Sequence, residues 1–165
     1  MKTTRRNLVI GGLVSGLAIP GCAKAASDPE DAFKDSEWRD LSADAWKERL
    51  DPLAYKVLRK EGTERAFTSP LNDEKREGVF VCAGCELELF KSEWKFDSGT
   101  GWPSFYTFIE GALGEKTDLR LWTPRREYHC ARCLGHQGHV FDDWPDVPTG
   151  LRYCNNGVAL KFIPT

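Results

Sequence analysis

Four of the six cysteines form two CxxC pairs, "CAGC" and "CARC", with 44 residues between the pairs. A short CxxC turn can direct both of its sulfurs at one ion, so two such turns can close a tetrahedral four-thiolate site. Two disulfides are the alternative outside the reducing cytoplasm, although a disulfide within one CxxC turn is strained. The spacing therefore predicts one closed structural zinc site, with iron as the minor alternative, and its ligands are Cys82, Cys85, Cys130 and Cys133.

Cys154 stands apart from these pairs, in the stretch "RYCNN" that we expect to be part of a β-strand. A solitary cysteine in a strand is most often a small buried hydrophobic residue. Here, however, Arg152 and Asn156 lie two residues to either side, and alternate residues of a strand project to the same face. A nearby guanidinium favours the thiolate, and an amide can bind a substrate oxygen. Cys154 is therefore a candidate nucleophile.

The chain has three histidines, and two of them are candidates for acid–base chemistry. His136 and His139 lie three apart in "GHQGHVFDD", directly before Asp142 and Asp143. A lone histidine is more often structural than catalytic, and we interpret His129, which precedes a cysteine of the second pair, in that way.

Two short helices are expected before the cysteines. Ser42 can cap the first helix, and Asp51 with Pro52 can begin the second, which Gly62 should end. Their apolar residues are assigned to packing.

From Gly78 the pattern changes to short β-type runs separated by Gly, Pro and Asp, which predicts a mainly β, compact antiparallel domain. No helix of useful length interrupts these runs. The expected strands are "GVFVC", "LELF", "SFYTFI", "LRLWTP", "REYHCA", "HVFDD" and "RYCNNGVALKFI".

Residues 1–25 have the order of an export signal. The pair Arg5-Arg6 precedes an apolar run from Leu8 to Ile19, and "AKA" follows, as in a twin-arginine signal peptide. The apolar run is shorter than the roughly 20 residues that span a bilayer. Cleavage after the "AKA" is one outcome; lipidation of Cys22, which would anchor the chain, is the other. We expect a periplasmic protein with a linker at 26–40 and one domain at 41–165.

The charge balance excludes a nucleic-acid-binding role. Removing residues 1–25 takes away four basic residues and no acidic one, so the formal charge of −2 becomes −6. A mildly acidic domain has no electrostatic footprint for nucleic acid.

Five motifs occur in the order found in B-type methionine sulfoxide reductases, the enzymes specific for the R epimer. They are "CAGC", "KFDSGTGWPSF", "CARC", "GHQGHVFDD" and "PTGLRYC". The stretch that resembles this family runs from about Gly78 to Ile163.

The resemblance implies two antiparallel sheets in a tent-like arrangement, with short N-terminal helices and zinc at one end. It implies that Cys154 attacks the sulfur of methionine R-sulfoxide in oxidised proteins and peptides, which forms a sulfenic acid. The resemblance also implies that Trp102 forms a wall of the pocket. It implies that His139 protonates the departing oxygen, with help from His136 and with orientation by Asp143. Arg152 and Asn156 are implied to position the cysteine.

The chain departs from the family pattern at three positions. Thr100 replaces the recycling cysteine of many members, so a sulfenic acid on Cys154 would need an external reductant, either a thioredoxin-like protein or a small thiol. Gln137 stands where leucine is common, and Trp144 where glycine is usual; both put the substrate preference in question. We expect a monomer.

Two other readings compete with the reductase. A non-catalytic zinc module that binds a partner protein would not need the set of polar groups around Cys154. A general thiol–disulfide oxidoreductase would need a CxxC outside the zinc pairs.

Overall fold

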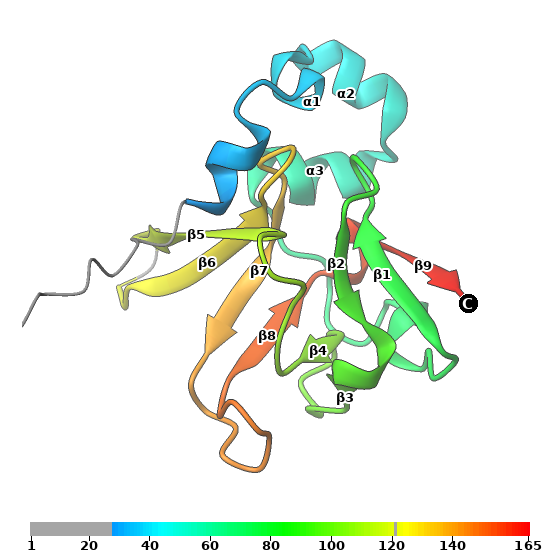
Figure 1. The fold of residues 1–165 in the computed structure, drawn as a ribbon, viewed down its shortest axis with the longest axis vertical. Coiled ribbons are helices and arrows are strands. Elements are labelled where there is room, and N and C mark those ends of the chain that lie inside the picture. Colours follow the sequence, from blue (N-terminus) through cyan, green and yellow to red (C-terminus); the bar gives the residue numbers. More distant parts are fainter. Residues whose placement is uncertain (1–27, 121) are drawn as a thin grey trace, which may run out of the picture.

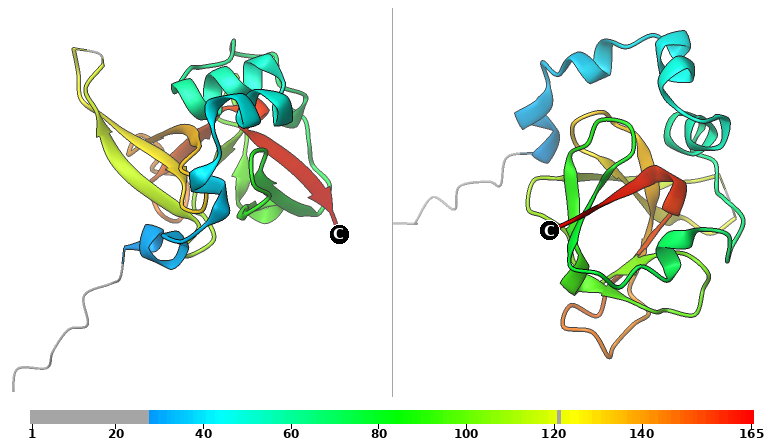
Figure 2. Two further views of the ribbon diagram at one scale, coloured as in Figure 1. Left: turned by 90° about the horizontal axis from the view of Figure 1, so that it is seen from above. Right: turned by 90° about the vertical axis from the view of Figure 1, so that its right-hand side faces the viewer.

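The computed structural model describes residues 28–120 and 122–165, so the proposed signal peptide and Cys22 lie outside the described residues. Two antiparallel sheets make up most of this part of the chain and splay apart below a group of short helices (Figures 1 and 2). The expected mainly β fold with two antiparallel sheets and short N-terminal helices is confirmed. No helix in the described part is long and apolar enough to cross a membrane.

The larger sheet has six strands in the order β3-β4-β8-β7-β6-β5, and every pairing in it is antiparallel. The smaller sheet has three strands in the order β2-β1-β9. In chain order, the strands are β1 (Gly78–Cys82), β2 (Glu88–Lys91), β3 (Lys95–Phe96), β4 (Ser104–Phe105), β5 (Leu113–Asp118), β6 (Arg125–Cys130), β7 (His136–Phe141), β8 (Arg152–Asn155) and β9 (Leu160–Pro164).

Aromatic side chains from both sheets fill the space between them. Phe80 and Phe90 come from the smaller sheet, and Phe105, Tyr128 and Tyr153 come from the larger one. The rings of Phe90 and Phe105 are stacked with centroids 4.1 Å apart, and Phe80 meets Phe105 edge-on at 5.0 Å. Alternation along β8 points Tyr153 into this core and leaves its neighbours on the opposite face.

Three α-helices lie together at one end of the sheets: α1 (Glu37–Asp40), α2 (Ala43–Arg49) and α3 (Pro52–Lys60) (Figure 1). The Ser42 hydroxyl accepts a hydrogen bond from the Ala45 amide, as expected for the start of α2. α3 begins at Pro52 as expected and ends at Lys60, where the C-cap Glu61 takes the left-handed conformation one residue before Gly62. Short 3₁₀ helices complete the set: η1 (Pro29–Phe33), η2 (Pro70–Asn72), η3 (Ser92–Trp94) and η4 (Gly157–Ala159).

The described part of the expected linker, from residue 28 to residue 40, packs on the domain instead of forming a free tether. Arg39 donates hydrogen bonds to the carbonyls of Ala131 at 2.8 Å and Arg132 at 3.3 Å. Glu30 contacts His129, with Oε1 and Nε2 2.7 Å apart. Charged residues that are aperiodic in the sequence are therefore held here by polar partners from the second CxxC turn.

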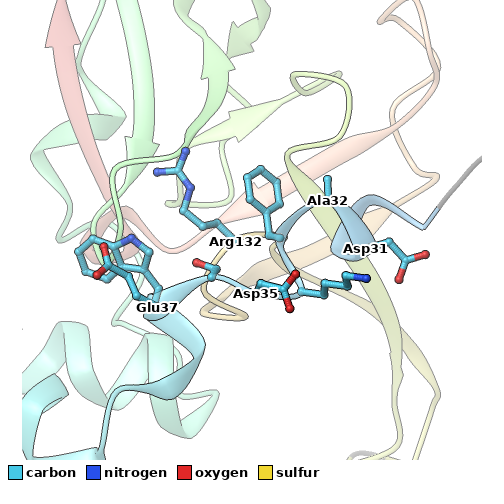
Figure 3. Close-up of a pocket in the computed structure, with 9 residues that line it drawn as sticks. Asp31, Ala32, Asp35, Glu37 and Arg132 are labelled. Carbon is cyan, nitrogen blue, oxygen red and sulfur yellow. The ribbon is translucent and has the colours of Figure 1, made fainter.

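A wide pocket of about 540 Å³ lies between residues 31–38 and Arg132 (Figure 3). Its lining contains no cysteine or histidine, so it offers no group for the chemistry expected of this chain.

Three expected strands differ from the observed ones. The strand expected at "LRLWTP" is replaced by β5, which ends at Asp118 because that side chain accepts the Arg120 amide and turns the backbone. β4 is short because the chain then crosses to the smaller sheet, where the Ile109 amide bonds to the Leu89 carbonyl. The run from 152 to 163 is split by η4, whose first amides bind the buried carboxylate of Glu64.

Candidate active site and metal centre

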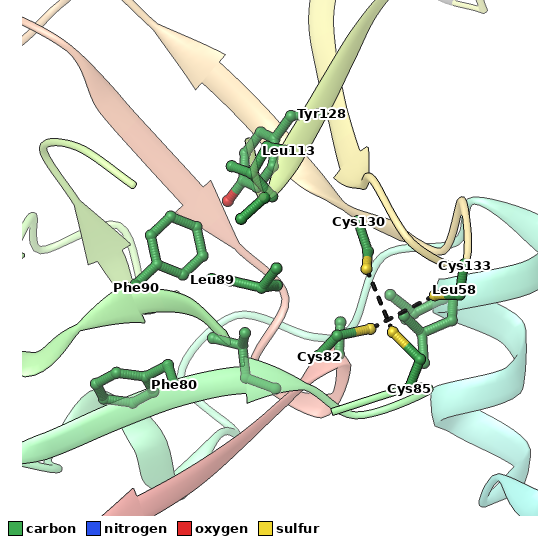
Figure 4. Packing of buried hydrophobic residues seen from close by; sticks show 14 of the residues in the cluster. Leu58, Phe80, Cys82, Cys85, Leu89, Phe90, Leu113, Tyr128, Cys130 and Cys133 are labelled. Atoms are coloured by element: carbon green, nitrogen blue, oxygen red, sulfur yellow. Dashed lines mark hydrogen bonds between the residues drawn. The ribbon is translucent and has the colours of Figure 1, made fainter. Parts of the chain in front are cut away.

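The four paired cysteines converge at one end of the core (Figure 4). The Sγ atoms of Cys82 and Cys133 are 3.7 Å apart, and those of Cys85 and Cys130 are 3.4 Å apart. All four sulfurs lie within 4.8 Å of one another, and all four side chains are buried. The expected cluster is therefore formed, and it could hold a metal ion.

The two CxxC turns repeat the same backbone geometry. The Glu86 amide bonds to the Cys82 carbonyl at 2.8 Å, and the Leu134 amide bonds to the Cys130 carbonyl at 2.9 Å. Glu86 and Leu134 both adopt the left-handed conformation, with φ of 60° and 59°. Each turn therefore folds back on itself and presents both of its sulfurs on one side.

The donor set fits zinc. Zinc–sulfur bonds of about 2.3 Å in a tetrahedron separate the sulfurs by about 3.8 Å, close to the spacing of these atoms. Contacts among the thiols raise the pKa of Cys82 and Cys130 and lower that of Cys85. Because the thiols oppose one another's ionisation, a cation is needed for all four to be thiolates.

Strand pairing places Cys154 inside the larger sheet. β8 lies between β4 and β7, and the register puts Cys154 opposite Ser104 on one side and His139 on the other. The cysteine is half-buried and lines a small pocket of about 110 Å³. The other lining residues are Thr63, Trp102, Arg125, Gly138, His139, Phe141, Asn155 and Asn156.

The surroundings of Cys154 keep its thiol protonated. Burial raises the pKa of Cys154, and the nearby Arg152 guanidinium and the Thr100 hydroxyl lower it without cancelling the effect of burial. Arg152 therefore favours the thiolate, as expected, but burial outweighs it. The physical reason is that the pocket desolvates the charge, and Asp143 offsets part of the arginine's field.

Arg152 is bound by Asp143 rather than left free to face the cysteine alone. Its Nε and Nη2 atoms donate to the two carboxylate oxygens of Asp143 at 3.0 and 2.6 Å. Its guanidinium also lies over the ring of Phe141, 4.5 Å from the centroid. Asp143 thus orients Arg152, and the carboxylate that contacts His139 is a different one.

That carboxylate is Asp118, at the end of β5. Its Oδ2 atom lies 2.8 Å from His139 Nε2, and Arg125 donates to the same oxygen at 2.6 Å. The backbone amide of Arg120, His139 and Arg125 together hold the pKa of Asp118 below its usual range. Burial lowers the pKa of His139, with Asp118 opposing it, so the resting imidazole is neutral at pH 7.

His136 lies behind His139 and does not line the pocket. Its ring centroid is 5.5 Å from that of His139, and its Nδ1 atom is 2.9 Å from Glu127 Oε1. Burial alone raises the pKa of Glu127, but His136 and Lys116 outweigh burial and lower the pKa. His136 is therefore an electrostatic neighbour of His139 and does not contact the pocket.

Trp102 forms one wall of the pocket and is held by Glu64. The indole Nε1 donates to the Glu64 carbonyl at 3.3 Å, and the Glu64 amide donates to Asn156 Oδ1 at 3.0 Å. Because Asn156 also donates to the Gln137 carbonyl at 2.9 Å, its side chain is used to fasten three segments together. The expected alignment of Asn156 with Arg152 and Cys154 on one strand face ends where β8 ends, at Asn155.

Comparison with known proteins decides the family. A model described as the SelR domain matches residues 50–164. This chain belongs to the SelR domain family.

Named relatives of this SelR domain share about half of its residues. The chain is 50% identical over 128 residues to "Peptide methionine sulfoxide reductase B1, chloroplastic" of Arabidopsis thaliana, over 77% of this chain and 63% of that protein. It is 52% identical over 126 residues to "Peptide methionine sulfoxide reductase MsrB" of Pseudomonas putida strain W619, over 76% of this chain and 94% of that protein. A protein of the same name from Leifsonia xyli is 49% identical over 124 residues, 74% and 89% of the two chains.

Thr100 lies beside the candidate nucleophile of the SelR domain. Its hydroxyl is close enough to Cys154 to lower the pKa of that thiol, and it also bonds to Ser98 at 2.8 Å. Ser98 in turn bonds to Ser104 at 2.7 Å. Among the described residues, every cysteine other than Cys154 belongs to the four-sulfur cluster, and none of them is in a disulfide.

The two other positions that depart from the family pattern, Gln137 and Trp144, do not line the pocket of this SelR domain. Gln137 is fully buried, donates to Cys82 Sγ at 3.3 Å and accepts from Asn155 at 3.2 Å. Trp144 packs against Phe96, with ring centroids 5.4 Å apart. Gln137 nevertheless contacts two lining residues, Asn155 and Asn156, so an effect on substrate preference stays a prediction.

The SelR domain also uses residues that the sequence patterns did not single out. Glu64 and Asp118 are single acidic residues in unremarkable sequence contexts, and their partners come from distant segments. Gly138 is needed because a Cβ there would lie 1.9 Å from the Cys154 carbonyl oxygen. In the sequence, the one signal for this close approach was the position of Gly138 between His136 and His139.

Proposed function

We propose that this protein is a B-type peptide methionine sulfoxide reductase that returns methionine R-sulfoxide in proteins and peptides to methionine. The enzyme class rests on the SelR domain and on the named relatives. The observation that supports the reaction is the β7–β8 pairing, which sets Cys154 opposite His139 in a pocket that includes Trp102.

In the proposed reaction, Cys154 attacks the sulfoxide sulfur while the sulfoxide oxygen receives a proton. The thiol proton passes to neutral His139, and the imidazolium, stabilised by Asp118, donates it to the oxygen. Loss of that oxygen from sulfur gives methionine and a sulfenic acid on Cys154, so one oxygen atom moves from substrate to enzyme. Positioned proton transfer of this kind contributes about 10²–10⁴-fold in rate.

Neighbouring groups have separate tasks in this proposal. Arg152, held by Asp143, stabilises the thiolate as it forms, because its guanidinium lowers the pKa of Cys154. Trp102 contacts the methyl group on the sulfoxide sulfur. His136 favours the neutral form of His139, whose pKa it lowers. Asn156 positions the segment that follows the cysteine.

Reduction of the sulfenic acid is assigned to an external thiol, from either a thioredoxin-like protein or a small molecule. Thr100 has no sulfur, and the remaining cysteines of the described residues are in the cluster. A full cycle therefore consumes two external thiols, which leave as a disulfide, and releases water.

Zinc is proposed as the metal of the four-cysteine cluster, one ion per chain. Cys82, Cys85, Cys130 and Cys133 would hold it, and four thiolates leave no open position for substrate. When bound, the ion supplies a structural cross-link.

Export is also part of the proposal. Residues 1–25 carry the twin-arginine pattern, with Cys22 as a lipid anchor in the alternative outcome, and the protein would act on oxidised proteins in the periplasm as a monomer. That route carries folded proteins, which would allow zinc to be loaded in the reducing cytoplasm. Replacing Arg5 and Arg6 by lysines should then keep the chain in the cytoplasm.

The reaction is tested by offering the full chain both epimers of N-acetyl-methionine sulfoxide with dithiothreitol, beside a Cys154→Ser variant. We expect consumption of the R epimer by the wild type and no consumption by the variant. Undiminished turnover by Cys154→Ser, or consumption of the S epimer alone, would contradict the mechanism. Without reductant, dimedone should trap one sulfenic acid per chain on Cys154.

A further inference from the structure

Phe67 combines a strained backbone with an exposed ring. Its φ is 63°, in the left-handed region that bulky residues rarely adopt, and its side chain is 73% exposed. Neither burial nor local preference explains this arrangement, and strained residues tend to persist where they serve a function. An exposed aromatic ring in such a position raises the question of what it binds.

Contacts with Gly101 hold the ring in place. The Phe67 amide donates to the Gly101 carbonyl at 2.8 Å, and Asn72 donates to the same oxygen at 3.1 Å. Gly101 itself has φ of 89°, and a Cβ on it would lie 2.7 Å from the Phe67 ring. The ring therefore packs over a position that only glycine can occupy, and the outer face of the ring is exposed to solvent.

The same two segments build the wall of the pocket. Gly101 directly precedes Trp102, whose indole binds the Glu64 carbonyl three residues before Phe67. Thr63 and Trp102 line the pocket, one from each segment. Phe67 is thus bonded to the residue that precedes Trp102, and it does not itself line the small cavity.

We propose that Phe67 binds the polypeptide on which the methionine sulfoxide is carried, by contact with an apolar side chain next to that residue. This inference rests on the proposed function, because it extends the same site outward. A pocket of about 110 Å³ takes little more than the methionine side chain, so the flanking residues of a peptide lie over its rim. There the rigid Phe67 ring offers apolar contact with little loss of side-chain entropy.

The test compares a small and a peptide substrate on the full chain. The small substrate is N-acetyl-methionine R-sulfoxide; the peptides carry methionine R-sulfoxide flanked by leucines or, in a second version, by glycines. Phe67→Asn removes the ring with a residue that tolerates the left-handed conformation, and Phe67→Tyr keeps the ring. Ile163→Ala, which truncates another exposed apolar side chain on β9, is the matched control.

We expect Phe67→Asn to lower kcat/KM about fivefold to tenfold for the leucine-flanked peptide, mainly through KM, and to leave the small substrate unchanged. Phe67→Tyr should retain activity on the leucine-flanked peptide, and Ile163→Ala should affect neither substrate. The glycine-flanked peptide should lose little in any variant.

Equal losses on all three substrates would overturn the inference, since the ring would then only support the Trp102 wall. No loss on the leucine-flanked peptide would overturn it as well, and would leave a second copy of the chain or a lipid as the occupant of this surface. Wild type that reduces no R-sulfoxide at all would instead defeat the proposed function, and the inference with it. Thermal unfolding of each variant separates these outcomes from a failure to fold.

Discussion

Cys154, the proposed nucleophile, has a pKa above its ordinary value, which favours the thiol. Its pKa reflects opposing effects: desolvation raises it, while Arg152 and Thr100 lower it. A protonated resting thiol resists unwanted oxidation, and it carries the proton that the sulfoxide oxygen needs. The neutral state of His139 suits this role, because the imidazole can accept that proton and then return it to substrate.

The first prediction concerns how the reactivity of Cys154 depends on pH. Alkylation of Cys154 by iodoacetamide should keep rising with pH beyond the usual range of a cysteine, since burial raises the pKa. Arg152→Met should raise the pKa further and slow alkylation at neutral pH, by about tenfold for each pKa unit. Mass spectrometry of the metal-loaded chain measures the rate, and Arg126→Met, on the exposed side of β6, is the control. Faster alkylation of Arg152→Met at neutral pH would refute this account.

A second prediction concerns Gln137, which connects the cysteine cluster to the active-site strand. Gln137→Leu removes the donor to Cys82 Sγ and the acceptor of the Asn155 amide, both within the core. Because hydrogen bonds around a metal ligand affect affinity by about 10–100-fold, metal should pass to a chelator at least tenfold faster. A colour-forming chelator measures this release. Trp144→Gly, a change at a position that does not touch the cluster, should release metal at the wild-type rate.

At the scale of elements, the proposed reaction depends on how closely β7 approaches β8. Gly138 faces Asn155 in the register, one residue from the pair of His139 with Cys154. Because the Cys154 carbonyl fills the space where a side chain would begin, a larger residue must push the two strands apart. His139 and Cys154, which pair across these strands, would separate with them.

The third prediction follows from this approach. Gly138→Ala should lower the free energy of unfolding by about 1–3 kcal/mol and reduce turnover of R-sulfoxide at least tenfold. Urea unfolding and the epimer assay measure the two effects. Gly150→Ala, in the loop after β7, places its Cβ in open space and should cost about 1 kcal/mol through backbone strain alone, with turnover retained. Wild-type turnover by Gly138→Ala would show that the strand spacing is not critical.

At the scale of the molecule, the cysteine cluster joins the two sheets where the helices cover them. Cys82 ends β1 of the smaller sheet, and Cys130 ends β6 of the larger one. Arg59 of α3 donates to the Cys133 carbonyl at 2.7 Å, and the N-terminal segment binds the adjacent carbonyls through Arg39. A metal ion here would therefore hold both sheets and the helices together.

The fourth prediction is that metal and fold are lost together. Native mass spectrometry should find one zinc ion per chain, and Cys82→Ser should bind none and show no cooperative thermal transition, because binding of structural zinc is worth about 10–16 kcal/mol. Cys154→Ser is the control and should keep both the ion and the transition. A metal-free chain with wild-type unfolding, or two CxxC disulfides under native conditions, would contradict this prediction.

The features predicted from the sequence alone were those carried by local spacing. Each CxxC pair is confined to one turn, so its two sulfurs must lie together, and two pairs leave few other arrangements. Helix starts at Ser42 and Pro52 are also local, since capping involves residues within one turn. The strand expected at "LRLWTP" was wrong because a side-chain contact of Asp118 ends β5 earlier.

The sequence by itself determined the four cysteines of the cluster, the mainly β class, the helix starts and the identity of the candidate nucleophile, because motif order and residue spacing are properties of the chain. Only the tertiary structure decided which carboxylate serves His139, that Asp143 serves Arg152, and that burial raises the pKa of Cys154. It also decided that Phe67 bonds to Gly101, the residue before Trp102. These depend on strand register and desolvation, which bring together residues far apart in the chain.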